Sequence, residues 1–337
     1  MTKDFNNESI IEANDVKNIG ILRVSKANHI MEMTNDLPSI APLYDYLWYE
    51  EEVSCLYAST NLGKSILAVQ IANEIAETRT VLYVDCELSD RQFMHRYSSE
   101  KSTCVFAEGL YRATIDIAGA DGMDEEQLIN SIHEAAVDCG AKVIVIDNLS
   151  WLSMSSEKAA DATKLMRKII GLRNEYKYSI LIVAHTPKVP KDELMTDNHL
   201  AGSKILMNFM DSAFCIGLDA KDKNGRYIKQ TKVRADEYRY DENNVMVCKI
   251  VKTDSGALIF ETIGYATERE MKRSFDKEAD KHEKLLEAKR LYAQGWTIRR
   301  ISDHLHVGHN TFKKADLESP ETPDIVEGAS GLEEESE

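Results

Sequence analysis

The 337-residue sequence contains no run of 18 or more apolar residues, so it predicts no membrane-spanning helix. Its N-terminus, MTKDFNNESIIEANDVKN, lacks the charged start and apolar stretch of a signal peptide. The six cysteines form no C-x-x-C pair, and several lie within apolar runs, which favours reduced, buried thiols over disulfides or zinc ligands. These absences predict a cytoplasmic protein without a membrane partner.

Basic residues are also scarce relative to acidic ones. The formal net charge of -16 argues against a protein that coats duplex DNA without specificity. Residues 282–314 are the exception, because they carry seven Lys or Arg against three Asp or Glu. Residues 315–337 carry nine acidic residues and no basic one, which is typical of a solvated, disordered tail. The pattern predicts a basic module between an acidic body and an acidic tail.

The hydrophobic content of 43% is enough for one large core and a small satellite domain. Short apolar runs alternate with helical patterns, and the expected strands are 54–58, 80–85, 142–148 and 179–186. Strands that are apolar on both faces and alternate with helices predict a mainly parallel sheet with helices on both sides. After residue 210, four runs joined by the turns DKNG and DENN predict antiparallel strands. The expected fold class is therefore α/β with an antiparallel extension.

The stretch LYASTNLGKSILAVQ (56–70) lies between a predicted strand and a predicted helix, as a phosphate-binding loop requires. Loop N–H groups and the helix N-terminus hold phosphate, Lys64 reaches the β/γ-phosphates, and the Ser65 hydroxyl helps to hold Mg²⁺. Ala58 replaces the usual first glycine, which a small residue in an ordinary conformation can do, whereas Gly63 is harder to replace. The predicted cofactors are ATP and Mg²⁺, held by Ala58, Ser59, Thr60, Asn61, Leu62, Gly63, Lys64, Ser65 and Ile66.

Polar residues end three of the predicted strands. Asp147 closes KVIVIDN, where a Walker B aspartate holds Mg²⁺ through water. Asp85 and Glu87 follow TVLYV; we expect Glu87 to activate the attacking water and Asp85 to cap the sheet edge. His185 closes SILIVA, where ligands bind in parallel sheets, so it is a candidate γ-phosphate sensor, although a lone histidine is usually structural.

In this order, ASTNLGKS, VDCE, VIVIDN, IVAHT and KVR resemble the RecA-fold ATPases of the DnaB and RepA hexameric helicase group, over roughly residues 38–263. The resemblance implies a RecA-like domain that forms a homo-oligomer, expected to be a hexamer, and makes Ala58 unremarkable. It implies that Lys232 and Arg234 reach the ATP of a neighbouring subunit. The alternative is that Lys229, Lys232 and Arg234 form the solvated face of a strand. The implied catalytic residues are Glu87, Lys64, His185, Arg234 and Lys232, with Ser65 and Asp147 at Mg²⁺.

In this fold the loops after the third and fourth predicted strands line a central channel, where single-stranded DNA would bind. The first loop offers Trp151 and Lys158, and a few lysines with an aromatic side chain are typical of a single-strand groove. The second loop offers Lys188, Lys191, Gly202 and Lys204. Nearby acidic residues dilute this charge, and Trp151 is equally compatible with packing in the core.

The basic module has helix-turn-helix spacing and resembles the DNA-binding tails of resolvases and invertases. Its last helix is expected to begin near Asn310. The expected small core consists of Leu291, Ile298, Ile301, Leu305, Val307 and Phe312. The expected phosphate contacts of duplex DNA are Arg299, Arg300, Lys313 and Lys314, and the expected base-edge contacts are His309, Asn310 and Thr311. The alternative is a helical bundle for protein contacts.

The expected domains are a polar N-terminal arm (1–37), the RecA-like ATPase domain (38–265), a charged helical linker (266–281), the helix-turn-helix module (282–316) and a disordered acidic tail (317–337). The first functional hypothesis is a ring-forming, ATP-hydrolysing DNA helicase or translocase for replication or transfer of a plasmid or mobile element. The second is a DNA-dependent ATPase switch or loader without unwinding. The third is a DNA-binding regulator whose nucleotide domain controls oligomerisation.

Overall fold

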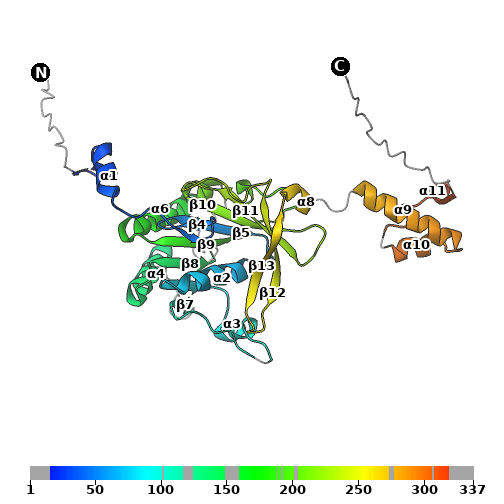
Figure 1. The fold of residues 1–337 in the computed structure, drawn as a ribbon, viewed down its shortest axis with the longest axis horizontal. Helices are drawn as coiled ribbons and strands as arrows, with labels where there is room; N and C mark the ends of the chain where they lie inside the picture. The colour runs from blue at the N-terminus through cyan, green and yellow to red at the C-terminus, as the bar shows by residue number, and fades with distance from the viewer. Residues whose placement is uncertain are drawn as a thin grey trace, which may run out of the picture. The chain divides into compact units, whose positions relative to one another are not determined.

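The computed structural model describes residues 16–100, 102–116, 124–148, 159–187, 189–190, 193–200, 204–272, 277–305 and 307–318. The chain forms two compact units, residues 1–272 and 273–337 (Figure 1). No helix among the described residues is long and apolar enough to cross a membrane.

A nine-stranded sheet forms the centre of the larger unit, in the order β13-β12-β11-β10-β5-β9-β8-β6-β7. Its strands are β5 (Val53–Ala58), β6 (Val81–Asp85), β7 (Leu110–Thr114), β8 (Val143–Asp147), β9 (Ser179–His185), β10 (Ser212–Leu218), β11 (Gly225–Lys232), β12 (Val245–Lys252) and β13 (Leu258–Ala266). The strands from β10 to β7 in this order pair in parallel, and β11, β12 and β13 extend the sheet with antiparallel pairs. The mainly parallel sheet and its antiparallel extension confirm the predicted fold class.

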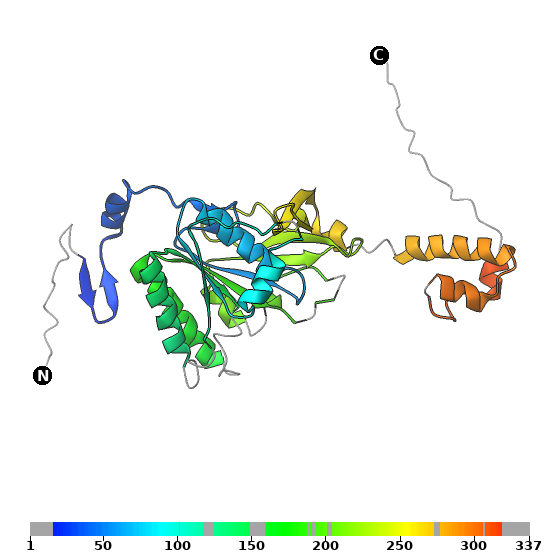
Figure 2. The same cartoon turned by 90° about the horizontal axis from the view of Figure 1, so that it is seen from below.

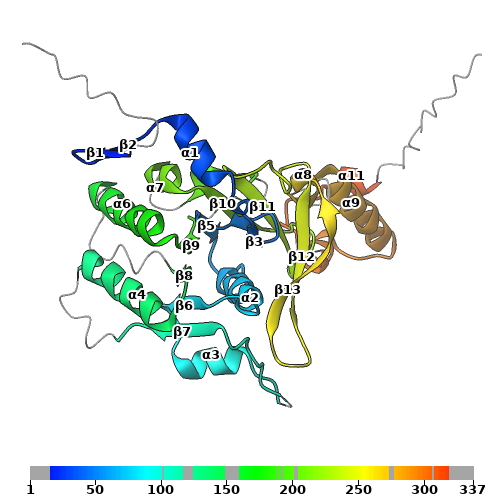
Figure 3. The same cartoon turned by 60° about the vertical axis from the view of Figure 1, so that its left-hand side comes forward.

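Helices cover both faces of this sheet (Figure 3). They are α2 (Lys64–Ala76), α3 (Asp90–Arg96), α4 (Glu125–Cys139), α6 (Ala159–Tyr176), α7 (Lys204–Phe209) and α8 (Glu268–Lys272), with a 3-10 turn η1 (Asp197–His199). Two apolar clusters lie on opposite faces: one includes Tyr57 with α4 and α6, and the other includes Leu56 with α2. Because neighbouring strand residues point to opposite faces, a fully buried strand such as β5 supplies both cores.

Two elements of the sheet differ from the sequence-based expectation. Strand β10 was expected to be antiparallel, but it pairs in parallel with β5. The helix α7, which the sequence pattern did not reveal, lies between β9 and β10 and makes the crossover that a parallel pair needs. The edge strand β7 was also missed, because its residues are half-buried or exposed and form no apolar run.

The N-terminal part of the larger unit contains two short hairpins and a helix. They are β1 (Lys17–Ile19) with β2 (Leu22–Val24), α1 (Ala27–Thr34), and β3 (Pro42–Tyr44) with β4 (Trp48–Tyr49). Helix α1 has no buried residue, whereas Trp48 is fully buried in the core. The polar arm expected for residues 1–37 is thus described only from residue 16, and tight packing begins after it.

The smaller unit is entirely helical, with α9 (Lys277–Ala293), α10 (Ile298–His304) and α11 (Lys314–Glu318). Both α10 and α11 pack against α9 (Figure 2). Every residue expected in the small core belongs to the apolar cluster found here, which also includes Ala288 and Leu317. The expected boundaries at 281/282 and 316/317 fall inside α9 and α11, and the second of them separates Leu317 from the rest of this core.

Candidate nucleotide-binding site

The loop between β5 and α2 has the conformation that its glycine predicts. Gly63 has φ +98°, and a Cβ atom there would lie 2.7 Å from Ile250 Cδ1 and 2.9 Å from Phe260 Cζ. The left-handed conformation and the close approach of β12 and β13 both require glycine. Ala58, by contrast, ends β5 in an ordinary strand and is fully buried. The apparent defect of the motif is therefore a core position.

Lys64 is buried at the start of α2, with its Nζ atom donating hydrogen bonds to Ala58 O (3.0 Å) and Ser59 O (3.1 Å). Burial lowers the pKa of Lys64, and the negative charges of Asp147 and Glu87 oppose this shift. A partly desolvated cation that contacts neutral carbonyl oxygens at a cavity wall favours an anionic ligand.

A cavity of about 300 Å³ opens at the carboxyl ends of the parallel strands. Its lining residues are Thr60, Asn61, Gly63, Lys64, Ser65, Ile66, Glu87, Arg96, Asp147, His185 and Ile250. It thus brings together the predicted catalytic residues Glu87, Lys64 and His185 with the predicted metal ligands. Of the expected loop residues, Ala58, Ser59 and Leu62 are not among those lining it. Ser59 Oγ instead contacts Thr186 Oγ1 at 2.9 Å, beside the cavity.

Asp147 ends β8 and is 2% exposed. Burial raises the pKa of its carboxyl group, while hydrogen bonds from the hydroxyls of Ser65 and Tyr83 lower it. The Tyr83 hydroxyl donates to Asp147 Oδ2 at 2.6 Å. A carboxylate and a serine hydroxyl beside a phosphate-sized cavity fit Mg²⁺, which prefers oxygen ligands and completes its shell with phosphate and water. Among the described residues, no group of three or more His, Cys, Asp or Glu side chains is arranged to hold a metal ion.

Glu87, Asn148 and His185 meet at the ends of the adjacent strands β6, β8 and β9. Asn148 Nδ2 donates a hydrogen bond to Glu87 Oε1 and lies 3.0 Å from His185 Nε2. The His185 Nε2 atom is 3.5 Å from Glu87 Oε1. The Glu87 side chain is 42% exposed, so its carboxylate is accessible to a water molecule in the cavity. The sequence showed only that the residue after Asp147 is not acidic. In the structure, Asn148 contacts both Glu87 and His185.

Asp85 supports Glu87 rather than replacing it. Its Oδ1 atom accepts hydrogen bonds from the backbone N–H groups of Glu87 (3.1 Å) and Leu88 (2.9 Å). Its Oδ2 atom accepts one from Arg112 Nε at 3.0 Å. Asp85 is 3% exposed and is not among the residues that line the cavity. These contacts agree with the expected capping role of Asp85, and Glu87 stays the predicted base.

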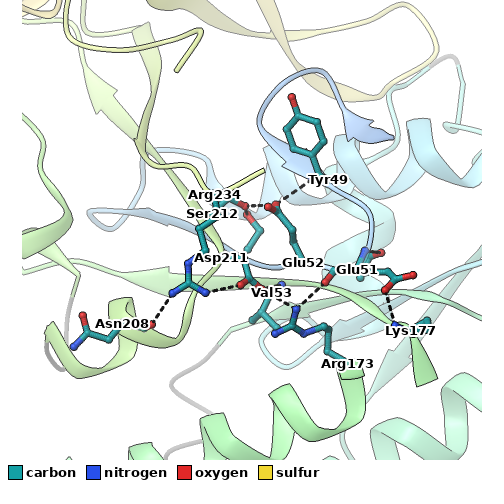
Figure 4. A network of polar contacts seen from close by, with 12 residues as sticks. Tyr49, Glu51, Glu52, Val53, Arg173, Lys177, Asn208, Asp211, Ser212 and Arg234 are labelled. Carbon is teal, nitrogen blue, oxygen red and sulfur yellow. Dashed lines mark hydrogen bonds and ion pairs between the residues drawn. The ribbon is translucent and has the colours of Figure 1, made fainter. Parts of the chain in front are cut away.

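Lys232 and Arg234 lie far from the cavity of their own chain. Lys232 pairs with Ala213 near the start of β10, and Arg234 forms an ion pair with Asp211 Oδ1 at 2.9 Å (Figure 4). Asp211 also accepts a hydrogen bond from the N–H of Val53, the first residue of β5. The phosphate loop follows the last residue of β5, so Arg234 and the cavity lie at opposite ends of this strand.

The alternative of a simple solvated strand face fails for one of its three residues. Lys229 is buried, and its Nζ atom lies 2.6 Å from Glu268 Oε2. Lys232 is partly buried and donates to Met207 O at 2.6 Å, and burial lowers its pKa. The Arg234 side chain is 55% exposed and therefore accessible to another molecule.

The expected channel loops fall mostly outside the described residues. Trp151, Lys158, Lys188, Lys191 and Gly202 all do so. Lys204 is the first residue of α7.

All seven expected DNA contacts of the smaller unit are exposed: Arg299, Arg300, His309, Asn310, Thr311, Lys313 and Lys314. Their setting differs from the expectation in one respect. The last helix begins at Lys314, not near Asn310. The sequence GHNT instead forms a turn in which the Thr311 N–H donates to Gly308 O at 2.9 Å, and Phe312 is then buried in the small core. His309 is 3.6 Å from Asp303 Oδ1, and the Arg300 guanidinium lies 3.8 Å from the Trp296 ring centroid.

Sequence reasoning missed two residues of the cavity, Arg96 and Ile250. Ile250 lies on β12, and nothing local in an apolar strand indicates that it faces a nucleotide site. Arg96 ends α3, the helix that follows Glu87, so its closeness to the base along the chain was the one available signal.

The chain is similar in part to a known protein family and to a solved structure. A family model described as an AAA domain matches residues 26–191. Among solved structures, a KaiC-like protein from the hyperthermophilic archaeon Pyrococcus horikoshii OT3 is 18% identical, with a TM-score of 0.47 over 67% of this chain and 98% of that chain. No curated protein shows a significant match. The mainly parallel sheet flanked by helices matches a RecA-like core, and the matched family model, which covers about half of the chain, supports an ATPase domain with a phosphate-binding loop.

Proposed function

We propose that the protein is an ATP-driven, ring-forming DNA helicase or translocase that serves replication or transfer of a plasmid or mobile element. The observation that carries the proposal is that the predicted catalytic residues lie at two opposite ends of the parallel strands. The cavity with Glu87 and Lys64 is at one end, and the exposed Arg234 is at the other. A head-to-tail contact between copies would complete each site, and such contacts generate rings or filaments.

The chain's own residues account for hydrolysis within this arrangement. Glu87 orients the attacking water and accepts its proton, with Asn148 fixing the carboxylate. Lys64 and the loop N–H groups bind the phosphates, and Ser65 and Asp147 would hold a Mg²⁺ ion, which would supply positive charge at the phosphates. His185 contacts both Asn148 and Glu87, so it is placed to respond to the γ-phosphate. Arg234 of a neighbouring copy adds positive charge as phosphoryl transfer proceeds.

The smaller unit supports the choice of DNA as the partner. Its exposed arginines and lysines surround a compact helical core, while the chain as a whole is acidic. The excess of basic residues within 282–314 favours binding of a polyanion there, and the 308–311 turn presents the polar side chains of His309, Asn310 and Thr311. This surface also keeps the regulator hypothesis open as a second candidate.

Hydrolysis is tested by measuring ATP turnover with and without single-stranded DNA. Glu87→Gln is expected to lower kcat by roughly 10²- to 10⁴-fold while ATP binding is retained, since it removes the general base. Lys64→Ala is expected to lose binding as well. Glu77→Gln, at an exposed position after α2, is the matched control and should behave as wild type. Wild-type protein without turnover under either condition would refute the enzymatic proposal.

Completion of the site by a neighbour is tested by mixing two inactive variants. Glu87→Gln retains Arg234, and Arg234→Ala retains Glu87, so mixed assemblies contain some complete sites. We expect partial recovery of turnover on mixing and none in either variant alone. Normal hydrolysis by assembled Arg234→Ala would show that the arginine does not act between subunits.

Two further assays separate the three functional hypotheses. Displacement of a strand from a forked DNA substrate during ATP hydrolysis supports the helicase, whereas DNA-stimulated hydrolysis without displacement supports the switch or loader. If deletion of residues 282–337 abolishes sequence-specific duplex binding and leaves turnover unchanged, the regulator is favoured. Ring formation is measured by the mass of the assembly in solution with and without nucleotide.

A further inference from the structure

We propose that Arg96 binds the terminal phosphate of ATP within its own chain and makes the site prefer ATP over ADP. The inference deepens the proposed function, because it rests on nucleotide binding in the cavity between Lys64 and Glu87. Arg96 is the last residue of α3 and lines this cavity together with both of them. Its position is fixed from three directions.

The first constraint is the turn that joins Glu87 to α3. Asp85 holds the backbone of this turn, and Ser89 and Gln92 form a reciprocal capping box at the helix start. Arg112 links the turn to the helix, since its side chain pairs with Asp85 at 3.0 Å and with Asp90 at 2.6 Å. Glu87 and Arg96 therefore stand at the two ends of one tightly held segment, and each faces the cavity.

The second constraint is an aromatic cluster at the end of α3. The Tyr97 ring lies 4.8 Å from the Phe93 ring and 5.3 Å from the Phe106 ring, measured between centroids. Tyr97 is 2% exposed, and burial raises the pKa of its hydroxyl, while the positive charge of Arg96 opposes the rise. Arg96, next to this cluster in the chain, is half-buried and lines the cavity.

The third constraint is a clamp to the hairpin of β12 and β13. Lys252 Nζ donates to Ser98 O at 2.5 Å, and Ser102 Oγ donates to Asp254 O at 2.6 Å. The same hairpin carries Ile250, which lines the cavity and approaches Gly63 of the phosphate loop. The segment that carries Arg96 therefore contacts the β12–β13 hairpin, and the same hairpin contacts the phosphate loop.

The charge of Arg96 suits a phosphate ligand. Among the described residues Arg96 forms no ion pair, whereas Arg112, a β7 residue that contacts the start of α3, pairs with two carboxylates. A guanidinium presents several N–H donors in a plane and binds phosphate oxygens in a bidentate manner. Lys64 and the loop N–H groups serve the phosphates nearest the loop, and Arg96 stands with Glu87 and His185 on the cavity wall outside it. The terminal phosphate is the group that this wall would contact.

The test compares nucleotide affinities of full-length variants with Mg²⁺ and without DNA, using the non-hydrolysable analogue AMP-PNP and ADP. Arg96→Ala is expected to weaken AMP-PNP binding about 10- to 100-fold, the range for loss of charge-assisted hydrogen bonds, and ADP binding less than about twofold. Arg91→Ala, an exposed arginine on the same helix, is the matched control and should change neither. Arg96→Lys keeps the positive charge and loses the planar set of N–H donors, so it should give an intermediate preference for AMP-PNP.

Each other outcome overturns the assignment in an identifiable way. Equal weakening of AMP-PNP and ADP by Arg96→Ala and Arg96→Lys would place Arg96 at an inner phosphate or in a purely structural role. No difference between the Arg96 and Arg91 variants would remove Arg96 from the site while leaving the proposed function intact. If wild-type protein binds neither nucleotide, the proposed function fails together with the role of Arg96.

Discussion

Removal of the Glu268 side chain is expected to destabilise the larger unit severely. Glu268 begins α8, is fully buried, and its carboxylate accepts three short hydrogen bonds. The donors are Lys229 Nζ, Tyr227 OH and Met195 N, each at 2.6 Å. Lys229 has one further acceptor, Met195 O at 2.9 Å. The contacts join β11, α8 and the segment after β9 in one buried network.

Glu268→Ala leaves a buried ammonium group without its counter-charge and two donors without an acceptor. Breaking a buried ion pair by removing one partner costs about 3–5 kcal/mol. Against a typical total of about 5–15 kcal/mol, this is about a fifth of the stability or more. Replacement of both charges, Lys229→Met with Glu268→Leu, should cost less, because the buried ammonium group is removed together with its counter-charge. Glu261→Ala, at an exposed position of β13, should be nearly neutral.

The assay is urea unfolding of the full-length variants, monitored by far-UV circular dichroism, with the transition of the larger unit fitted separately from that of the helical unit. We expect a lower midpoint with an unchanged slope for Glu268→Ala. A loss no larger than that of Glu261→Ala would refute the reasoning, as would a double variant as unstable as the single one. Severe destabilisation would also show that the ATPase domain extends beyond its predicted end at residue 265, because Glu268 lies outside that limit.

Three further predictions concern the site. Gly63→Ala is expected to reduce nucleotide affinity at least tenfold in equilibrium binding, since the residue is left-handed and its Cβ would clash with the β12–β13 hairpin, whereas Ala58→Gly should bind nearly as wild type. Burial raises the pKa of Asp147, so its stabilising contribution is present below about pH 4 and is lost as pH rises through the raised value. Asp147→Asn should therefore raise the thermal midpoint without Mg²⁺ at pH 7–8, by a margin that disappears toward pH 4, and equal midpoints throughout would contradict this. Asp211→Asn should release Arg234 and lower turnover of the assembled protein with little change in ATP affinity; unchanged turnover would show that this ion pair does not position the arginine.

Features of the chain that depend on short range were predictable from the sequence. The phosphate loop, the capped helices α3 and α4, and the buried strands β5, β6, β8 and β9 follow from local conformational preferences and apolar patterns. The ends of parallel strands share one edge of a sheet, so placing Glu87, Asp147 and His185 at strand ends already predicted that they would meet. The sequence predicted that Gly63 is harder to replace than Ala58, and its positive φ and close neighbours agree with this.

Other features depend on which distant segments pack together, and only the tertiary structure decided them. The parallel pairing of β10 with β5 required a crossover through α7, whose six residues carry little periodic signal. The contact of Asn148 with Glu87, and the entry of Arg96 into the cavity, arise because α3 is held between the end of β6 and the β12–β13 hairpin. The position of Arg234 follows from the reversal of β11 against β10, which carries that side chain to the edge opposite its own phosphate loop. Local sequence sets which residues can do chemistry, whereas strand order and direction set which of them share a site.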